Sequence, residues 1–212
     1  MNTKLKIITV ALLSAMVFSC GEKAREAKET LSLMEDLKEG AEEMEKAVEK
    51  SNDKLAERRE RGDTLAMNYK DLGRFLPASL GEYERQGEPK GNSINMPGMS
   101  YSEANASYID GEDNMLSVEL IDYNTAANMF VMATAAYGVG IDIESDSEHT
   151  KGFKENEDLS GWTVLQKENP DVTVFIGIAQ RFFLKVEADN TDDVDKIKEL
   201  ALKIAKKELV NL

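Results

Sequence analysis

The chain has 212 residues, of which 42% are hydrophobic and 31% are charged, and its 40 acidic and 26 basic side chains give a formal net charge of −14. This acidic balance excludes a basic nucleic-acid-binding protein, because binding to phosphates needs clustered Lys and Arg. The single Cys excludes a disulfide scaffold, and the hydrophobic share excludes a wholly disordered chain.

The first 20 residues have the layout of a secretion signal. A basic start with Lys4 and Lys6 is followed by an apolar run from Ile7 to Phe18 and then by Ser19-Cys20. The apolar run has 12 residues, and at about 1.5 Å per helical residue it is too short to span a bilayer core of about 30 Å. We therefore expect a signal peptide over residues 1–19 and no membrane span there.

The segment Val17-Phe18-Ser19-Cys20 resembles the lipobox of bacterial lipoprotein precursors, although Phe18 is bulkier than the residue usual in that family. The resemblance implies that Cys20 becomes a lipidated N-terminus, whose acyl chains anchor the protein to the membrane. In that family an Asp after the Cys retains the protein in the inner membrane, so Gly21 implies delivery to the outer membrane, facing the periplasm, where the cell has one. An ordinary cleaved signal and an uncleaved anchor remain the alternatives.

Residues 20–62 are predicted to form the lipidated Cys20 and an amphipathic helical stalk. From Glu22 to Arg61 the chain has no Pro and no aromatic residue, and Glu, Lys, Arg and Ala dominate, which favours a helix. Gly62 is a natural stop. The apolar residues of this segment form a stripe along one face of the helix, which leaves three arrangements open. The helix is a free stalk, it folds back on the domain, or it binds a partner, which includes a second copy in a weak homo-oligomer. Its apolar residues follow at helical spacing: Ala27, Leu31, Met34, Leu37, Ala41, Met44, Val48, Ser51 and Leu55.

Residues 63–212 are predicted to form one α+β globular domain. The first half is expected to contain a short helix over 64–73, a strand over 81–86, a Gly- and Pro-containing loop over 87–99, and strands over 102–109 and 115–123. A largely buried helix over 126–137 and an acidic loop follow. The second half is expected to contain strands over 161–167, 172–179 and 182–188 and a helix over 192–209. This order favours an antiparallel sheet with helices packed on one face, behind a long N-terminal helix. The layout is loosely similar to PsbP/Mog1-type domains.

Motifs for catalysis are missing from the sequence. His149 is the only His, and no Gly-x-Ser-x-Gly elbow, zinc-ligand spacing, P-loop or dinucleotide-binding glycine pattern occurs. We therefore predict a protein that is not an enzyme and uses no cofactor, and an unrecognised hydrolase is a further alternative.

Two patterns are candidates for metal binding, although no metal is expected. Met96 and Met99 bring two thioethers together, which suits Cu(I) outside the cytoplasm. The acidic residues Asp142, Glu144, Asp146 and Glu148 alternate, so an extended backbone would point all four carboxylates the same way, as Ca²⁺ requires. A solvated acidic loop and packing of the Met side chains are the simpler interpretations.

The sequence therefore predicts a non-catalytic, membrane-anchored envelope lipoprotein. Its globular domain is expected to bind an envelope protein partner or a small ligand, and no nucleic acid. The alternative is a metal-binding envelope protein that uses Met96 and Met99 or the acidic segment.

Overall fold

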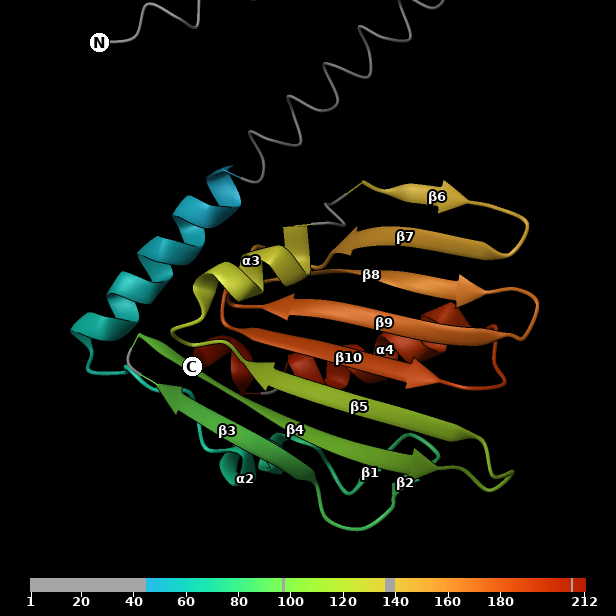
Figure 1. The fold of residues 1–212 in the computed structure, drawn as a ribbon. Coiled ribbons are helices and arrows are strands. Elements are labelled where there is room, and N and C mark those ends of the chain that lie inside the picture. The colour runs from blue at the N-terminus through green and yellow to red at the C-terminus, as the bar shows by residue number, and fades with distance from the viewer. Residues whose placement is uncertain (1–44, 97, 136–139, 207) are drawn as a thin grey trace, which may run out of the picture. The chain divides into compact units, whose positions relative to one another are not determined.

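The computed structural model describes residues 45–96, 98–135, 140–206 and 208–212. This part of the chain has the predicted α+β fold, built on an antiparallel sheet of ten strands (Figure 1). The strands are β1 (Ser79–Leu80), β2 (Tyr83–Arg85), β3 (Lys90–Met96), β4 (Met99–Ile109), β5 (Met115–Asp122), β6 (Asp142–Glu144), β7 (Glu148–Lys154), β8 (Leu159–Gln166), β9 (Asp171–Ile178) and β10 (Phe182–Ala188). The helical elements are residues 45–60, α2 (Tyr69–Leu72), η1 (Gly73–Phe75), α3 (Ala127–Ala135), α4 (Val194–Ala205) and η2 (Leu209–Asn211).

Two antiparallel meanders make up the sheet. The strand order is β1-β2-β4-β5-β10-β9-β8-β7-β6, and β3 pairs with β4 beside β2. The meanders join where β10 pairs with β5, from Phe182 opposite Asp122 to Ala188 opposite Leu116. Because β6 lies at the far edge, the chain crosses the sheet between β5 and β6, and α3 forms part of this crossover (Figure 1).

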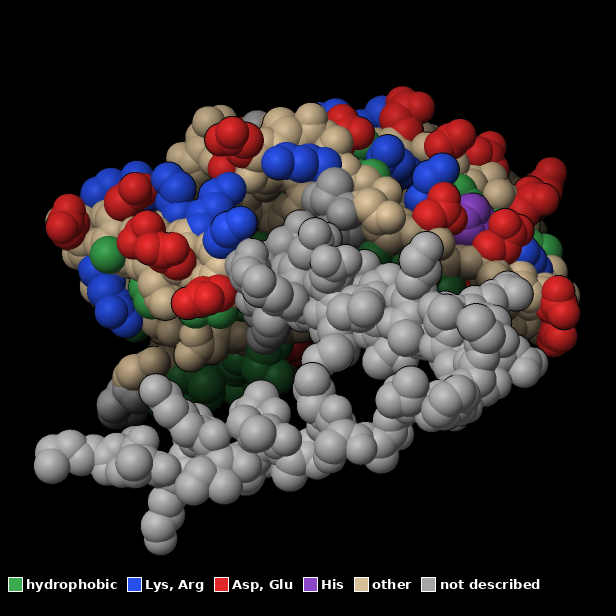
Figure 2. Space-filling view, turned by 90° about the horizontal axis from the view of Figure 1, so that it is seen from above, with side chains coloured by type: hydrophobic (Ala, Val, Ile, Leu, Met, Phe, Trp, Pro, Cys, Tyr) green, Lys and Arg blue, Asp and Glu red, His purple; other side chains and the backbone are tan. Residues whose placement is uncertain are grey.

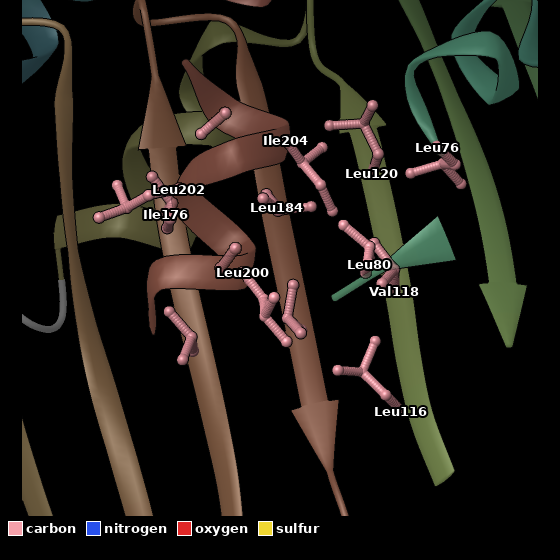
Figure 3. Packing of buried hydrophobic residues seen from close by; sticks show 14 of the residues in the cluster. Leu76, Leu80, Leu116, Val118, Leu120, Ile176, Leu184, Leu200, Leu202 and Ile204 are labelled. Carbon is pink, nitrogen blue, oxygen red and sulfur yellow. The ribbon is translucent and has the colours of Figure 1, made fainter. Parts of the chain in front are cut away.

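The main core lies between one face of the sheet and α4. In β5 the alternate residues Leu116, Val118 and Leu120 are buried, as the predicted strand pattern requires. Figure 3 shows Ile204 of α4 between Leu120 and Leu184 of β10. The helix ends at Ala205, earlier than the predicted 192–209, and η2 follows. The buried residues of α4 have helical spacing: Ile197, Leu200, Ala201, Leu202, Ile204 and Ala205.

Helices cover both faces of the sheet, which corrects the predicted single covered face. A Cβ built on Gly177 of β9 would lie 3.0 Å from Thr134 and 3.2 Å from Phe130, both in α3. The preceding residue, Ile176, belongs to the core under α4, and successive strand residues point to opposite faces. The prediction failed because the sequence marks this second face weakly: β9 presents Asp171, Thr173 and Gly177 there, and Phe175 is its one large apolar residue on that side.

The crossover helix is less buried than the sequence predicted. Phe130 and Val131 of α3 are buried, but Met129 is 41% and Met132 is 72% exposed. A helix that is apolar all round was expected to be enclosed. Instead it lies on the surface with one side against the sheet, so it leaves thioether side chains in solvent.

Three predicted loops and helices differ from the structure. The predicted loop over 87–99 contains β3, and the predicted acidic loop contains the β6–β7 hairpin. Both are edge regions whose strands obtain their backbone hydrogen bonds from a neighbouring strand, so weak local propensity is overridden. The helix predicted over 64–73 is shorter, because Asn68 caps α2 by accepting from the backbone N–H of Lys70.

The predicted stalk lies partly outside the described residues. Residues 1–44, with the predicted signal peptide, Cys20 and the first part of the stalk, are not described, and residues 45–60 are helical. Gly62 follows this helix with a φ of +80°, a conformation that glycine adopts without strain. Across the described residues, no helix combines the length and the hydropathy needed to cross a bilayer.

Candidate functional site

Helix 45–60 packs on the domain at the end of the sheet where β5 stops and β10 begins. Its buried residues Ser51, Leu55 and Arg58 are four and three positions apart and form one helix face. Arg58 Nε donates to Asn124 Oδ1 at 2.9 Å, and Nη2 donates to the carbonyl of Asn124 at 3.2 Å. Eight positions before Arg58, Lys50 Nζ donates to the carbonyl of Glu157 at 3.0 Å. The helix is therefore held at two points.

Next to Arg58 lies a cluster of charged side chains that is largely buried. Arg181 donates to both carboxylate oxygens of Asp122, from Nε at 2.9 Å and from Nη2 at 2.8 Å. Its Nη1 donates to Asp63 at 2.7 Å, and Asn124 Nδ2 donates to the other oxygen of Asp63 at 2.7 Å. We call Arg58, Asp63, Asp122, Asn124 and Arg181 the tether clamp. It links helix 45–60 and Asp63, three positions after this helix, to the end of β5 and to the turn before β10.

The backbone places Arg181, the turn residue before β10, next to Asp122, the last residue of β5, whose register partner is Phe182. The turn between β9 and β10 uses Ala179 and Gln180 at φ values of +50° and +54°, as hairpin turns that match the strand twist require. The backbone N–H of Tyr123 then donates to the carbonyl of Arg181 at 2.9 Å. This bond continues the β5–β10 ladder by one step and brings the Arg181 guanidinium over Asp122.

Charge pairing compensates for burial in the tether clamp. The side chain of Arg181 is 6% exposed and that of Asp122 is 0% exposed. Burial acts to lower the pKa of Arg181, but the hydrogen bonds and charges of Asp122 and Asp63 outweigh burial and raise that pKa above its usual value. For Arg58 the balance is the opposite, because burial and then repulsion from Arg181 lower its pKa. The pairing of charges therefore makes the tether clamp a stabilising contact between helix 45–60 and the sheet.

Sequence reasoning missed the tether clamp, although one signal was present. Asp122 continues the alternation of Leu116, Val118 and Leu120, so it falls on the core-facing side of β5. A carboxylate at such a position needs a cationic partner, because an unpaired buried charge is strongly unfavourable. The identity of that partner had no local signal, since Arg181 is 59 positions away.

The acidic segment does not bring its four carboxylates together. Asp142 and Glu144 lie on β6, the turn over residues 145–147 contains Asp146, and Glu148 starts β7. The hairpin turn therefore breaks the extended backbone that the alternating pattern needed. Within the described part of the chain, no three His, Cys, Asp or Glu side chains are grouped so that they could hold a metal ion.

Carboxylates of this hairpin have partners of their own. His149 Nε2 lies 2.7 Å from Asp142 Oδ1, and this contact lowers the pKa of Asp142. Lys167 Nζ donates to Glu144 at 2.9 Å and likewise lowers the pKa of that group. Figure 2 shows His149, in purple, on the surface among acidic and basic side chains. The arrangement is that of a solvated, charge-paired hairpin.

The two predicted thioether ligands lie opposite each other at the tip of the β3–β4 hairpin. Met96 and Met99 are paired in the strand register, and Met96 is 51% exposed. Both lie on the sheet face opposite Ser100 and Ser102, which are buried. The hairpin therefore brings together the two side chains that a Cu(I) site would use.

Two clefts lie away from the tether clamp, and no sequence motif marked either one. The first, of about 630 Å³, opens to solvent and lies beside α2, η1, the end of β2 and the loop before β3. Its charged lining residues are Lys70, Arg74, Arg85 and Glu88. The second, of about 410 Å³, lies at the β4–β5 turn and is lined in part by Glu82, Asp110, Glu112, Asn114 and Lys196. Their charges differ in sign: the first is mainly basic and the second mainly acidic.

Comparisons with known proteins give little information on this chain. No family model matches it, and no curated protein matches it. Among solved structures, it is similar to the X-ray structure of an uncharacterized protein from Mycobacterium smegmatis, described as the Rv0999 ortholog, with 9% sequence identity and a TM-score of 0.33 over 66% of this chain and 97% of that chain. A likeness of this degree supports no inference about function.

Proposed function

We propose that this chain is a lipid-anchored lipoprotein of the cell envelope, whose domain is non-catalytic and binds an envelope protein partner or a small ligand. The lipobox-like Val17-Phe18-Ser19-Cys20 supports the anchor, and Gly21 favours an outer membrane facing the periplasm. The tether clamp carries the proposal, because it joins the helix that leads from the anchor to one end of the sheet. The first cleft lies at the β2–β3 edge of the sheet. The second lies at the β4–β5 turn, the opposite end of β5 from the tether clamp. Neither cleft is lined by a residue of the tether clamp.

The stalk leaves limited apolar surface for a partner. Ser51 and Leu55 belong to the predicted apolar stripe and are buried against the domain. A partner, or a second copy in a weak homo-oligomer, would therefore use the stripe residues before position 45, of which Leu31, Met34, Leu37 and Met44 are the largest. The domain itself is then the main candidate for recognition.

Metabolic labelling with an alkyne-bearing palmitate tests the anchor. We expect the wild-type protein to incorporate the label and to sediment with membranes, because Cys20 is the only thiol available for the thioether-linked lipid. Cys20→Ala should abolish the labelling and move the protein to the soluble fraction as unprocessed precursor. Ser19→Ala, which keeps a small residue before the cleavage point, is the matched control and should label normally. Labelling of Cys20→Ala would contradict the proposed anchor.

The second candidate function is Cu(I) binding at the β3–β4 hairpin, and the direct register of Met96 and Met99 favours it. Competition with a colorimetric Cu(I) chelator measures this affinity in the purified protein. If the hairpin is the site, replacing both residues by Leu should abolish binding, because Leu keeps the volume and removes the thioether. Replacing Met129 and Met132, the exposed thioethers of α3, by Leu provides the matched control. Equal binding by both variants would exclude the hairpin as the site.

A further inference from the structure

The first cleft concentrates positive charge in an acidic protein. Its charged lining residues are Lys70, Arg74, Arg85 and Glu88, three cations and one anion, whereas the chain as a whole has a net charge of −14. The second cleft has the opposite balance, with Glu82, Asp110 and Glu112 against Lys196. A cleft lined mainly by cations attracts anions, because its low-dielectric walls focus the local field.

Arg85 is held in place at this cleft by the backbone. Its Nη1 donates to the carbonyl of Leu76 at 2.6 Å and its Nε donates to the carbonyl of Gly87 at 3.0 Å. The side chain is 17% exposed, and Nη2 has its nearest carboxylate, that of Glu88, at 3.7 Å. Glu88 is itself 93% exposed, so its carboxylate is largely hydrated and easily displaced. A fixed guanidinium with remaining N–H groups is well suited to an oxyanion, since little side-chain entropy is lost on binding.

Part of the remaining lining is apolar and rigid. Pro77, Ala78 and Pro89 contribute to the walls, and proline restricts the backbone in the unbound state as well. Gly73 allows the close approach of Pro89, because a Cβ at this position would lie 3.1 Å from the Pro89 ring. A cleft of about 630 Å³ is within the range found for small-molecule sites. A ligand with one charged end and one apolar end would match both parts of the lining.

We propose that this cleft binds a small organic anion, a carboxylate or phosphate ester whose oxyanion pairs with Arg85 and whose short apolar body lies on Pro77, Ala78 and Pro89. This inference deepens the proposed function, on which it rests for the binding role of the domain. Lys70 and Arg74 are exposed at the cleft and strengthen the positive field, and Arg74 also pairs with Asp71 at 3.1 Å, which offsets part of its charge. Glu88 opposes anion binding.

Isothermal titration calorimetry tests the proposal on the full chain carrying Cys20→Ala, which is purified without lipid or detergent. With hexyl phosphate as the probe, we expect a dissociation constant on the order of 0.1 mM at low salt. Hexanoate should bind within about tenfold of this value, whereas inorganic phosphate and hexanol, which each lack one half of the ligand, should bind more than about tenfold more weakly. Equal binding of hexanol, or no heat from hexyl phosphate, would overturn the proposal.

Variants of the charged residues locate the site. Arg85→Met should weaken hexyl phosphate binding by about tenfold or more, and the double variant Lys70→Gln/Arg74→Gln, which changes only exposed side chains, by about threefold to tenfold. Glu88→Gln should strengthen binding by about twofold to threefold. Arg59→Gln, an exposed charge on helix 45–60, is the matched control and should change nothing. Unchanged affinity in the double variant, or weaker binding by Glu88→Gln, would refute the site even if Arg85→Met fails to fold.

Two further results separate the possible sources of the anion and the two proposals. Phosphatidylglycerol vesicles should not co-sediment this chain, because its net charge of −14 opposes an anionic bilayer; Arg85-dependent co-sedimentation would overturn the assignment to a free amphiphile. The calorimetry needs no lipid anchor. Binding of hexyl phosphate without palmitate labelling of the wild-type protein would therefore refute the anchor alone, and labelling without binding would refute this inference alone.

Discussion

Replacing Arg181 by Met should destabilise the domain by about 3–5 kcal/mol, because it removes the ion-pair partner of the buried carboxylate of Asp122. Asp122 is 0% exposed and loses both guanidinium hydrogen bonds. Asp63 loses its contact at 2.7 Å as well. Methionine fills much of the vacated volume, so the loss reports the charge and not a large cavity.

Urea unfolding followed by circular dichroism measures the free energy of unfolding of each variant. Lys203→Met is the control, because its pair with Glu199 is a surface contact whose side chains are 56% and 71% exposed. This control should change the free energy of unfolding by less than about 1 kcal/mol. Similar decreases in the free energy of unfolding of the two variants would contradict the stabilising role of the tether clamp.

A double variant separates the ion pair from packing. Asp122→Asn removes the charge of the carboxylate and retains its size. If Arg181 and Asp122 stabilise each other, Arg181→Met/Asp122→Asn should lose less stability than the sum of the two single variants, with a coupling of about 1–3 kcal/mol. Additive losses would show that the pair has no net interaction.

The parts of the fold that were predictable have strong periodicity. The alternation of Leu116, Val118 and Leu120 predicted β5, and the three-and-four spacing from Ile197 to Ile204 predicted the core face of α4. These segments carry their own signal because one side of each must be apolar. β3 has Gly91 and two Asn residues, and β6 has two acidic residues out of three. Such strands form only because a neighbour supplies the pairing, so no local pattern predicts them.

The candidate site was predictable to a smaller extent than the fold. Cys20, Met96 and the acidic segment stand out because each is a local pattern. The tether clamp is assembled from residues that lie far apart along the chain, such as Arg58 and Arg181. The residues of the first cleft all fall between positions 69 and 89, but no motif connects them. Their chemistry depends on which segments the sheet brings together. Only Asp122, a charged residue in a core-facing position, signalled that a buried partner must exist.

Gly161 in β8 is the glycine whose replacement should be most damaging to the sheet. A Cβ at this position would lie 1.9 Å from the carbonyl oxygen of Phe175 in β9, far closer than two such atoms can approach. β8 is paired on both sides, with β7 and with β9, so it cannot move away without breaking a ladder. We therefore expect Gly161→Ala to lower the free energy of unfolding by about 3 kcal/mol, through overpacking against backbone.

Two other glycines provide matched controls for the same substitution. A Cβ on Gly91 would lie 2.0 Å from the carbonyl oxygen of Glu103, but β3 is paired with β4 alone and can shift outward. Gly111 has nothing within 4 Å of the added atom and no positive φ. In urea unfolding, Gly91→Ala should therefore lose less stability than Gly161→Ala, and Gly111→Ala should stay within about 0.5 kcal/mol of the wild type. Equal losses of stability in Gly91→Ala and Gly161→Ala would show that pairing on two sides does not restrain β8. Unchanged stability of Gly161→Ala would show that β8 and β9 do not approach each other as closely as the structure places them.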